Sequence, residues 1–155
     1  EPRPQPPTSM QPLLVVAGVL AIAGPFRTID PRTARLHAVA NRAIHRGRLD
    51  VATQVYQRCL QHESPHPDSY LLAALHHVRH RDWERARQTY REGNRVHPLE
   101  PKLLQGWGLL ESRVGNMRRA QQLLRRCVTV DPRHGPVMRW QRFRAADHEH
   151  EESRV

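Results

Sequence analysis

The chain has 155 residues, which suits one domain, and its two cysteines are too few for a disulfide-stabilised scaffold. The formal net charge of +10 favours acidic partners such as nucleic acid, anionic lipid or an acidic protein, although an arginine-rich proteome or a place in a large assembly explains it equally well. The sequence has no glycine-rich phosphate loop and no convincing set of nucleophile, base and acid, so we expect no enzyme, no cofactor and no small-molecule substrate.

Residues 1–11 are rich in proline and are expected to form an extended tail. Four prolines lie within the first seven residues. Each proline ring removes a backbone donor and clashes with the preceding helical turn, so no helix is predicted here. The first residue is Glu rather than Met, and we therefore expect a processed or trimmed chain.

Residues 12–26 contain the apolar run LLVVAGVLAIA, which begins at Leu13 and ends at Ala23. A helix from Ser9 to about Gly24 would be roughly 24 Å long, whereas a bilayer core is about 30 Å thick. We favour a short membrane anchor or a membrane-buried helix. The alternatives are a signal-type segment, an interfacial helix, and a strand or helix buried against a partner protein.

The charges after this segment would set the orientation of an anchor. Arg27, Arg32 and Arg35 follow it, and only Asp30 opposes them. The positive-inside tendency would then leave the following domain on the stroma or matrix side of a plastid or mitochondrial membrane, or alternatively on the cytoplasmic face of a membrane.

A period of 34 residues runs through the rest of the chain. It is marked by three alanines, Ala52, Ala86 and Ala120. Four residues after each alanine stands a large side chain, and these are Tyr56, Tyr90 and Leu124. Seven residues after each alanine stands a small one, and these are Cys59, Gly93 and Cys127. Offsets of four and seven share one helical face, so we expect these residues to pack between helices and the cysteines to be buried and unpaired.

The same period predicts where the helices end. Five residues before each alanine is a turn position, occupied by Gly47, Arg81 and Gly115. Glycine at such a position can adopt a positive φ and end a helix. The predicted helices are 33–46 with 48–63, 67–80 with 83–96, and 101–114 with 117–130.

These elements predict an all-α fold, a short α-solenoid of three helix-turn-helix units. The units span about 33–66, 67–100 and 101–134 within a repeat domain of residues 27–147. A capping helix is expected over about 135–147, with Trp140 packing back on the third unit, followed by a polar tail at 148–155.

A 34-residue unit of helix, tight turn and helix resembles the tetratricopeptide repeat (TPR) family. The third unit also resembles the half-a-TPR (HAT) variant, which occurs in RNA-processing factors and in plastid proteins that protect particular transcripts. The residues that match this variant are Trp107, Glu111, Gly115, Ala120 and Pro132.

The resemblance implies that the first helices of the units line a concave partner-binding face. The inward positions are His37, Asn41 and His45 in the first unit, Leu71, Leu75 and Arg79 in the second, and Lys102, Gln105, Leu109 and Arg113 in the third. An apolar floor with a basic edge suits a peptide or helix with acidic flanks. The alternative is that the charged side chains only solvate the rim.

Some members of the resembled family hold chaperone C-termini with a carboxylate clamp of lysine, asparagine and arginine. The corresponding positions here are His37, Asn41, Leu72, Lys102 and Gly106. Only Asn41 and Lys102 fit the clamp, so we expect no receptor for chaperone tails.

The second helices carry many arginines, which predict a convex basic surface. We select Arg87, Arg91, Arg118 and Arg125 as contacts for phosphates or anionic lipid head groups. His76, His77 and His80 lie close together, but no cysteine or acidic cluster joins them, so we expect no metal site.

Two hypotheses of function follow. The first is a non-catalytic protein-interaction scaffold or accessory subunit of a membrane-associated, organellar complex. The second is an RNA-binding factor that contacts RNA through its arginine-rich helices.

Overall fold

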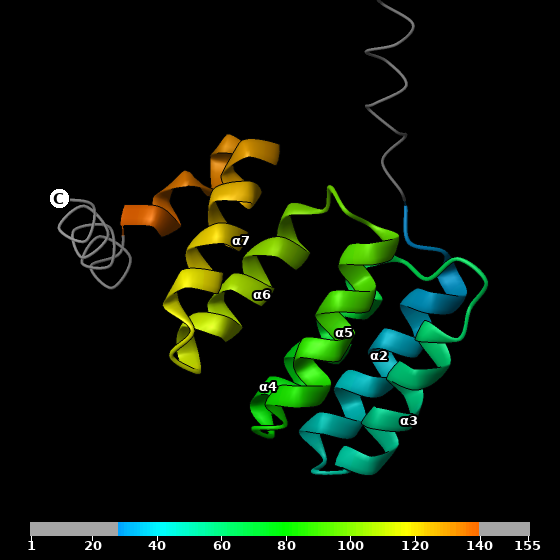
Figure 1. Cartoon of the computed structure of the whole chain (residues 1–155). Coiled ribbons are helices and arrows are strands. Elements are labelled where there is room, and N and C mark those ends of the chain that lie inside the picture. The colour runs from blue at the N-terminus through cyan, green and yellow to red at the C-terminus, as the bar shows by residue number, and fades with distance from the viewer. Residues whose placement is uncertain (1–27, 140–155) are drawn as a thin grey trace, which may run out of the picture.

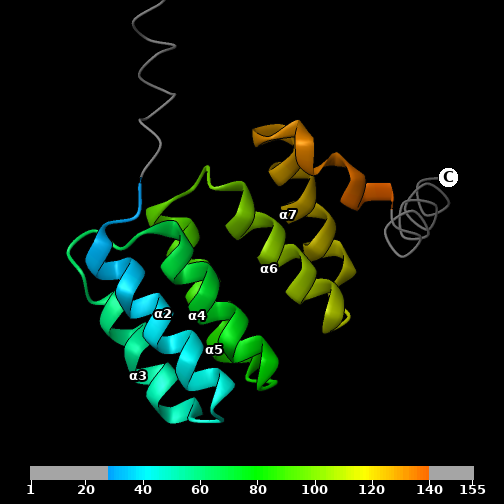
Figure 2. The same ribbon diagram turned by 180° about the vertical axis from the view of Figure 1, so that it is seen from behind.

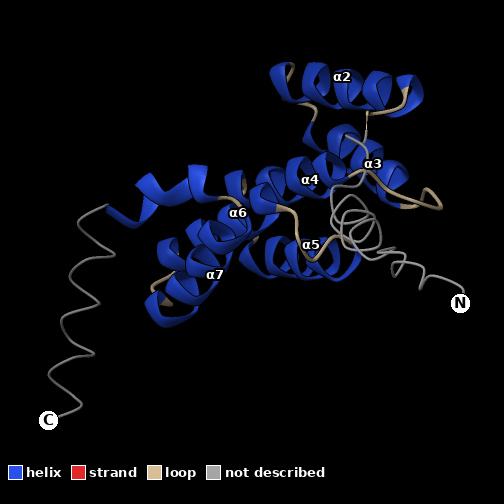
Figure 3. Cartoon of the chain, turned by 90° about the horizontal axis from the view of Figure 1, so that it is seen from above, coloured by secondary structure: helices blue, strands red, loops and turns tan. Residues whose placement is uncertain are grey.

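The computed structural model describes residues 28–139, which form α-helices and one 3-10 helix (Figure 1). The α-helices are α2 (Pro31–His45), α3 (Leu49–Leu60), α4 (Pro67–Arg79), α5 (Trp83–Val96), α6 (Pro101–Arg113) and α7 (Met117–Val130). The 3-10 helix η1 spans Pro132–Arg139. No β-strand occurs within the described residues (Figure 3), so the all-α prediction is confirmed.

Several expectations concern residues outside the described range. They are the proline-rich tail, the apolar segment 12–26, Trp140 with most of the capping helix, and the polar tail at 148–155. Between residues 28 and 139, no helix is both long enough and apolar enough to cross a membrane.

The helices begin where short-range signals place them. Pro31, Pro67 and Pro101 each stand in the first turn of α2, α4 and α6, where a missing backbone N–H costs nothing. Two of the second helices, α5 and α7, begin at side-chain caps, whereas α3 has none. Asp82 accepts a hydrogen bond from the backbone of Arg85 at the start of α5, and Asn116 accepts one from Arg119 at the start of α7.

The predicted helices agree with the observed ones, and α5 and α7 match at both ends. The C-terminal segment differs, because Pro132–Arg139 forms a 3-10 helix where a loop and then an α-helix were expected. Pro136 lies inside that segment and has no backbone N–H to donate, which disfavours a regular α-helix. Val137 nevertheless packs against Ala120 and Leu124, so the segment covers the end of the third unit.

The repeat positions form the core, as the 34-residue period predicts. Ala52, Ala86 and Ala120 all have 0% exposure, and both cysteines are buried and free. Gly93 takes the small position in α5, where an added Cβ would lie 2.8 Å from the Cβ of Tyr70. That contact explains why the second unit has glycine where the other two have cysteine.

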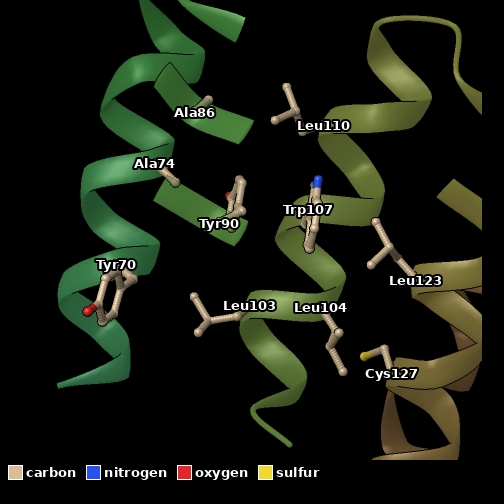
Figure 4. Close-up of a cluster of buried hydrophobic side chains, with 10 residues drawn as sticks. All are labelled: Tyr70, Ala74, Ala86, Tyr90, Leu103, Leu104, Trp107, Leu110, Leu123 and Cys127. Atoms are coloured by element: carbon tan, nitrogen blue, oxygen red, sulfur yellow. The ribbon is translucent and has the colours of Figure 1, made fainter. Parts of the chain in front are cut away.

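The largest core cluster joins the second and third units (Figure 4). Tyr90 of α5 lies on one side of Trp107 of α6, and Leu123 of α7 lies on the other. Burial of such side chains contributes about 1.5–3 kcal/mol each.

The three hairpins follow one another along the chain, from α2/α3 through α4/α5 to α6/α7 (Figures 1 and 2). Helix α6 packs against both α4 and α5, whereas α7 packs chiefly against α6 and η1. Both second helices, α5 and α7, therefore pack against α6.

The three turns share a left-handed residue. Gly47 has φ 71°, Arg81 has φ 59° and Gly115 has φ 85°. An L-residue in this region costs roughly 1–2 kcal/mol, which glycine avoids. The second unit therefore carries backbone strain at Arg81 that the other units lack.

Replacing Arg81 with glycine should stabilise the protein. The relief of strain exceeds the added entropy of the unfolded chain, so we expect Arg81→Gly to raise the free energy of unfolding by about 0.5–1 kcal/mol. Urea denaturation measures this change. The matched control is Gln88→Gly at an exposed site in α5, which should lower the free energy by about 1 kcal/mol. An Arg81→Gly protein no more stable than the parent would contradict the prediction.

Candidate functional site

The ten residues predicted on the concave face do not form one open surface. His37 is only 7% exposed, and its Nε2 lies 2.9 Å from the hydroxyl of Ser69, so it joins α2 to α4. Burial lowers the pKa of His37, outweighing the attraction of Asp68, and this favours the neutral ring. The prediction that His37 contacts a partner is therefore corrected, because its side chain belongs to the interior.

Three of the predicted residues on α6 already have partners within the chain. Lys102 Nζ forms an ion pair with Asp68 Oδ1 at 3.4 Å, and Gln105 Oε1 lies 2.9 Å from His134 Nδ1. Leu109 packs against the cluster that η1 covers. These side chains hold neighbouring elements together.

The remaining exposed residues define a surface that we call the exposed strip: Asn41, His45, Leu75, Arg79 and Arg113. Leu75 is 37% exposed, whereas the predicted Leu71 is half-buried and packs on the core. The Tyr56 hydroxyl donates to Asn41 Oδ1 over 3.4 Å.

The structure gives a physical reason why no carboxylate clamp forms. Leu72 packs against the core cluster of the first two units. At Gly106 an added Cβ would lie 2.6 Å from the hydroxyl of Tyr90, so no longer side chain fits there. Together with the buried His37, these contacts remove three of the five clamp positions.

The predicted convex contact Arg87 is engaged inside the protein. Its Nε donates to Glu111 Oε1 at 2.9 Å, its Nη2 to Glu111 Oε2 at 3.1 Å, and its Nη1 to Glu84 at 2.7 Å. We therefore correct its assignment from a surface contact to a link between α5 and α6.

Glu111 is the centre of this link and is 3% exposed. Trp107 Nε1 donates to its carboxylate at 3.0 Å, and Asn116 Nδ2 donates at 3.3 Å. Burial alone would raise the pKa of Glu111, but the hydrogen bonds from Arg87 and Trp107 outweigh it and hold the pKa below the usual value. We call these four side chains the Glu111 hub.

Beside the hub, four arginines surround a cavity of about 510 Å³, which we call the arginine cavity. Arg91 and Arg95 reach it from α5, and Arg119 and Arg126 from α7. Only Arg91 was among the residues selected from the sequence. Arg118 and Arg125 are exposed but do not line the cavity.

A sequence signal for the cavity existed but was not specific. Arginines 91 and 95 are one helical turn apart, and arginines 119 and 126 are two turns apart, so each pair shares a helix face. The same helices carry other arginines at similar spacing. Only the packing of α5 and α7 against α6 shows which face is shared.

The clustered histidines differ in their surroundings. His76 is buried, with its Nε2 2.9 Å from Thr53 Oγ1, and its ring centroid is 4.7 Å from that of His80. Burial, followed by the neighbouring His80 and His77, lowers the pKa of His76 to about 4. Across residues 28–139, no group of three or more His, Cys, Asp or Glu side chains could hold a metal ion.

Comparison with known proteins identifies the fold. No protein-family model matches the chain. The chain is similar to the TPR domain of Sgt2 from Aspergillus fumigatus, with a TM-score of 0.65, 17% identity, and coverage of 84% of this chain and 87% of that one. It is also similar to the first TPR of Spaghetti (RPAP3) bound to the HSP90 peptide SRMEEVD, with a TM-score of 0.60, 12% identity, and coverage of 83% and 97%.

One curated protein resembles the chain in sequence. This is the chloroplastic PsbB mRNA maturation factor Mbb1 of Chlamydomonas reinhardtii, which is 33% identical over 79 residues. The match covers 50% of this chain but spans only 12% of the length of that factor.

Removing the carboxylate of the hub should strongly destabilise the protein. We expect Glu111→Ala to lower the free energy of unfolding by roughly 3–5 kcal/mol, because Arg87 and the Trp107 indole lose a buried partner. The matched control is Glu84→Ala, which removes the other carboxylate on the same arginine. The Glu84 side chain is 84% exposed, so its loss should cost less than about 1 kcal/mol. Equal losses in urea denaturation would show that the hub does not stabilise the contact between α5 and α6.

Proposed function

We propose that this chain, which has the tetratricopeptide-repeat fold, is a non-catalytic module that binds a segment of another protein along the exposed strip. The observation that carries the proposal is the recurrence of one exposed basic side chain in every unit. These side chains are His45, Arg79 and Arg113, spaced by 34 residues along the first helices. The peptide bound to the similar TPR domain of Spaghetti supports this mode of use.

The chemistry of the strip indicates the kind of partner. It contains two arginines, one histidine and one amide, and no acidic residue. Exposed Leu75 stands one helical turn before Arg79 in α4. A partner segment with acidic residues around an apolar side chain would complement this arrangement, with the charges guiding association.

The proposal is tested by charge reversal within the strip. The tagged chain, its Arg79→Glu/Arg113→Glu variant and an Arg58→Glu/Arg118→Glu control are used to isolate partners from organelles of the source cells. All four arginines are exposed, so the control has the same change of charge. We expect the strip variant to lose at least about 90% of a partner that the control retains, because reversed charges repel an acidic segment.

Leu75→Asp provides an independent variant, which should weaken the same partner through the apolar contact. Equal recovery of every partner by the parent, strip and control proteins would contradict the proposal. Circular dichroism of each variant would confirm that the helices are retained.

We also propose a plastid location, which the similarity to a chloroplastic protein supports. Membrane attachment through residues 12–26 remains a prediction, because that segment lies outside the described residues. Carbonate extraction of fractionated organelles tests both statements. Recovery of the protein outside plastids would contradict the plastid location. Its release from membranes by carbonate would contradict membrane attachment.

A second candidate function is RNA binding, which one specific observation favours. The curated relative is described as an mRNA maturation factor, and the matched segment covers half of this chain. Binding of the chain to single-stranded RNA should weaken steeply as salt rises, because phosphate contacts release counterions. Filter binding at increasing salt measures this, and the absence of binding at low salt would exclude the function.

A further inference from the structure

We infer that the arginine cavity is a binding site for the phosphate backbone of single-stranded RNA. This inference rests on the second candidate function. It identifies the surface that contacts RNA, which is distinct from the exposed strip on the first helices.

The cavity has the charge and the size of a phosphate site. Four of the side chains around it are arginines, and none is acidic. Among the described residues, no carboxylate forms an ion pair with Arg91, Arg95, Arg119 or Arg126. A volume of about 510 Å³ is in the range of sites that hold a ligand of nucleotide size.

Two of the arginines are held in place by contacts within the protein. The guanidinium of Arg119 lies 5.0 Å from the centroid of the Trp107 ring. Arg126 Nη2 donates to the carbonyl of Pro98 at 3.0 Å. Each guanidinium has five N–H donors, so these contacts leave others available for phosphate oxygens. An arginine that is already ordered loses less entropy when it binds an anion.

The junction between the first and second units shows that the cavity is not a general property of the repeat. Thirty-four residues before Arg91, Arg95 and Arg126 stand Gln57, Gln61 and Glu92. The position equivalent to Arg119 is Arg85, which pairs with Asp82. The four equivalent positions therefore carry one arginine and one glutamate, whereas the cavity carries four arginines.

The two junctions also differ at Trp107, because the equivalent residue in the second unit is Ala73. The indole is part of the core, and its N–H is used by Glu111. Arg119 lies over the ring, so the aromatic face is not free for a base to stack. The cavity therefore contacts the backbone of RNA and does not read the sequence of bases.

The inference is tested with a fluorescent 12-nucleotide oligouridylate and the full chain. The cavity variant is Arg91→Gln/Arg95→Gln/Arg126→Gln, which removes three charges. The matched control, Arg35→Gln/Arg42→Gln/Arg58→Gln, removes three charges from exposed sites outside the cavity. Fluorescence anisotropy at several salt concentrations gives the affinity and its salt dependence for each protein.

We expect the cavity variant to weaken RNA binding by at least about tenfold and the control by less than about threefold. The slope of log affinity against log salt should become shallower by about 2 for the cavity variant. Each phosphate contact with a single strand contributes roughly 0.7 to the steepness of this slope, and the variant removes three arginines. The double variant Arg91→Gln/Arg95→Gln should show part of the same effect. Both side chains are exposed, so we expect this variant to keep the fold, which circular dichroism checks.

Other outcomes would overturn the inference in distinguishable ways. Equal weakening in the cavity and control variants would show that RNA binds through net charge, leaving the second candidate function intact. The absence of RNA binding by the parent chain would exclude both. A decaglutamate peptide that competes with RNA at equal charge concentration would assign the cavity to acidic protein segments instead.

Discussion

The buried carboxylate of Glu111 determines how the second and third units meet. It accepts two hydrogen bonds from Arg87 of the preceding hairpin, one from Trp107 of its own helix and one from Asn116 in the following turn. A buried charge is tolerated only with such partners, so α5, α6 and the turn after α6 must keep their relative positions. Nonpolar packing of Tyr90, Trp107 and Leu123 surrounds this link but is less directional.

The hub also decides which arginines are free to bind a ligand. It uses Arg87, and by holding Trp107 it gives Arg119 an aromatic surface to lie on. The neighbouring arginines of α5 and α7 then surround the same cavity. The exposed strip lies on the first helices and depends on a different feature, the 34-residue recurrence of basic side chains. The chain thus has two candidate surfaces of similar charge but different construction.

The fold could be predicted because helix ends and core positions depend on local signals. Prolines in the first turn mark the starts of α2, α4 and α6, and aspartate or asparagine caps mark those of α5 and α7. Helix α3 has no side-chain cap, and its place follows from the turn at Gly47 and the period of the alanines. The 3-10 helix was missed because Pro136 prevents an α-helix at a place where the sequence pattern of the repeat had already ended.

The candidate sites were harder to predict, because exposure depends on contacts between distant residues. His37 is buried by its contact with Ser69, 32 residues away, and Arg87 is engaged by Glu111, 24 residues away. The 34-residue period does not reveal these two contacts, because neither Ser69 nor Glu111 has a residue of the same type at the equivalent positions of the other units.

The most direct test is the indole N–H signal of Trp107 in a nuclear magnetic resonance titration with single-stranded RNA. Trp107 lies beneath Arg119 and lines the arginine cavity, whereas Trp83 at the start of α5 does not line it. The account predicts a saturable shift of the Trp107 signal and an unchanged Trp83 signal. A constant Trp107 signal, with shifts confined to backbone amides around Arg79 and Arg113, would contradict it.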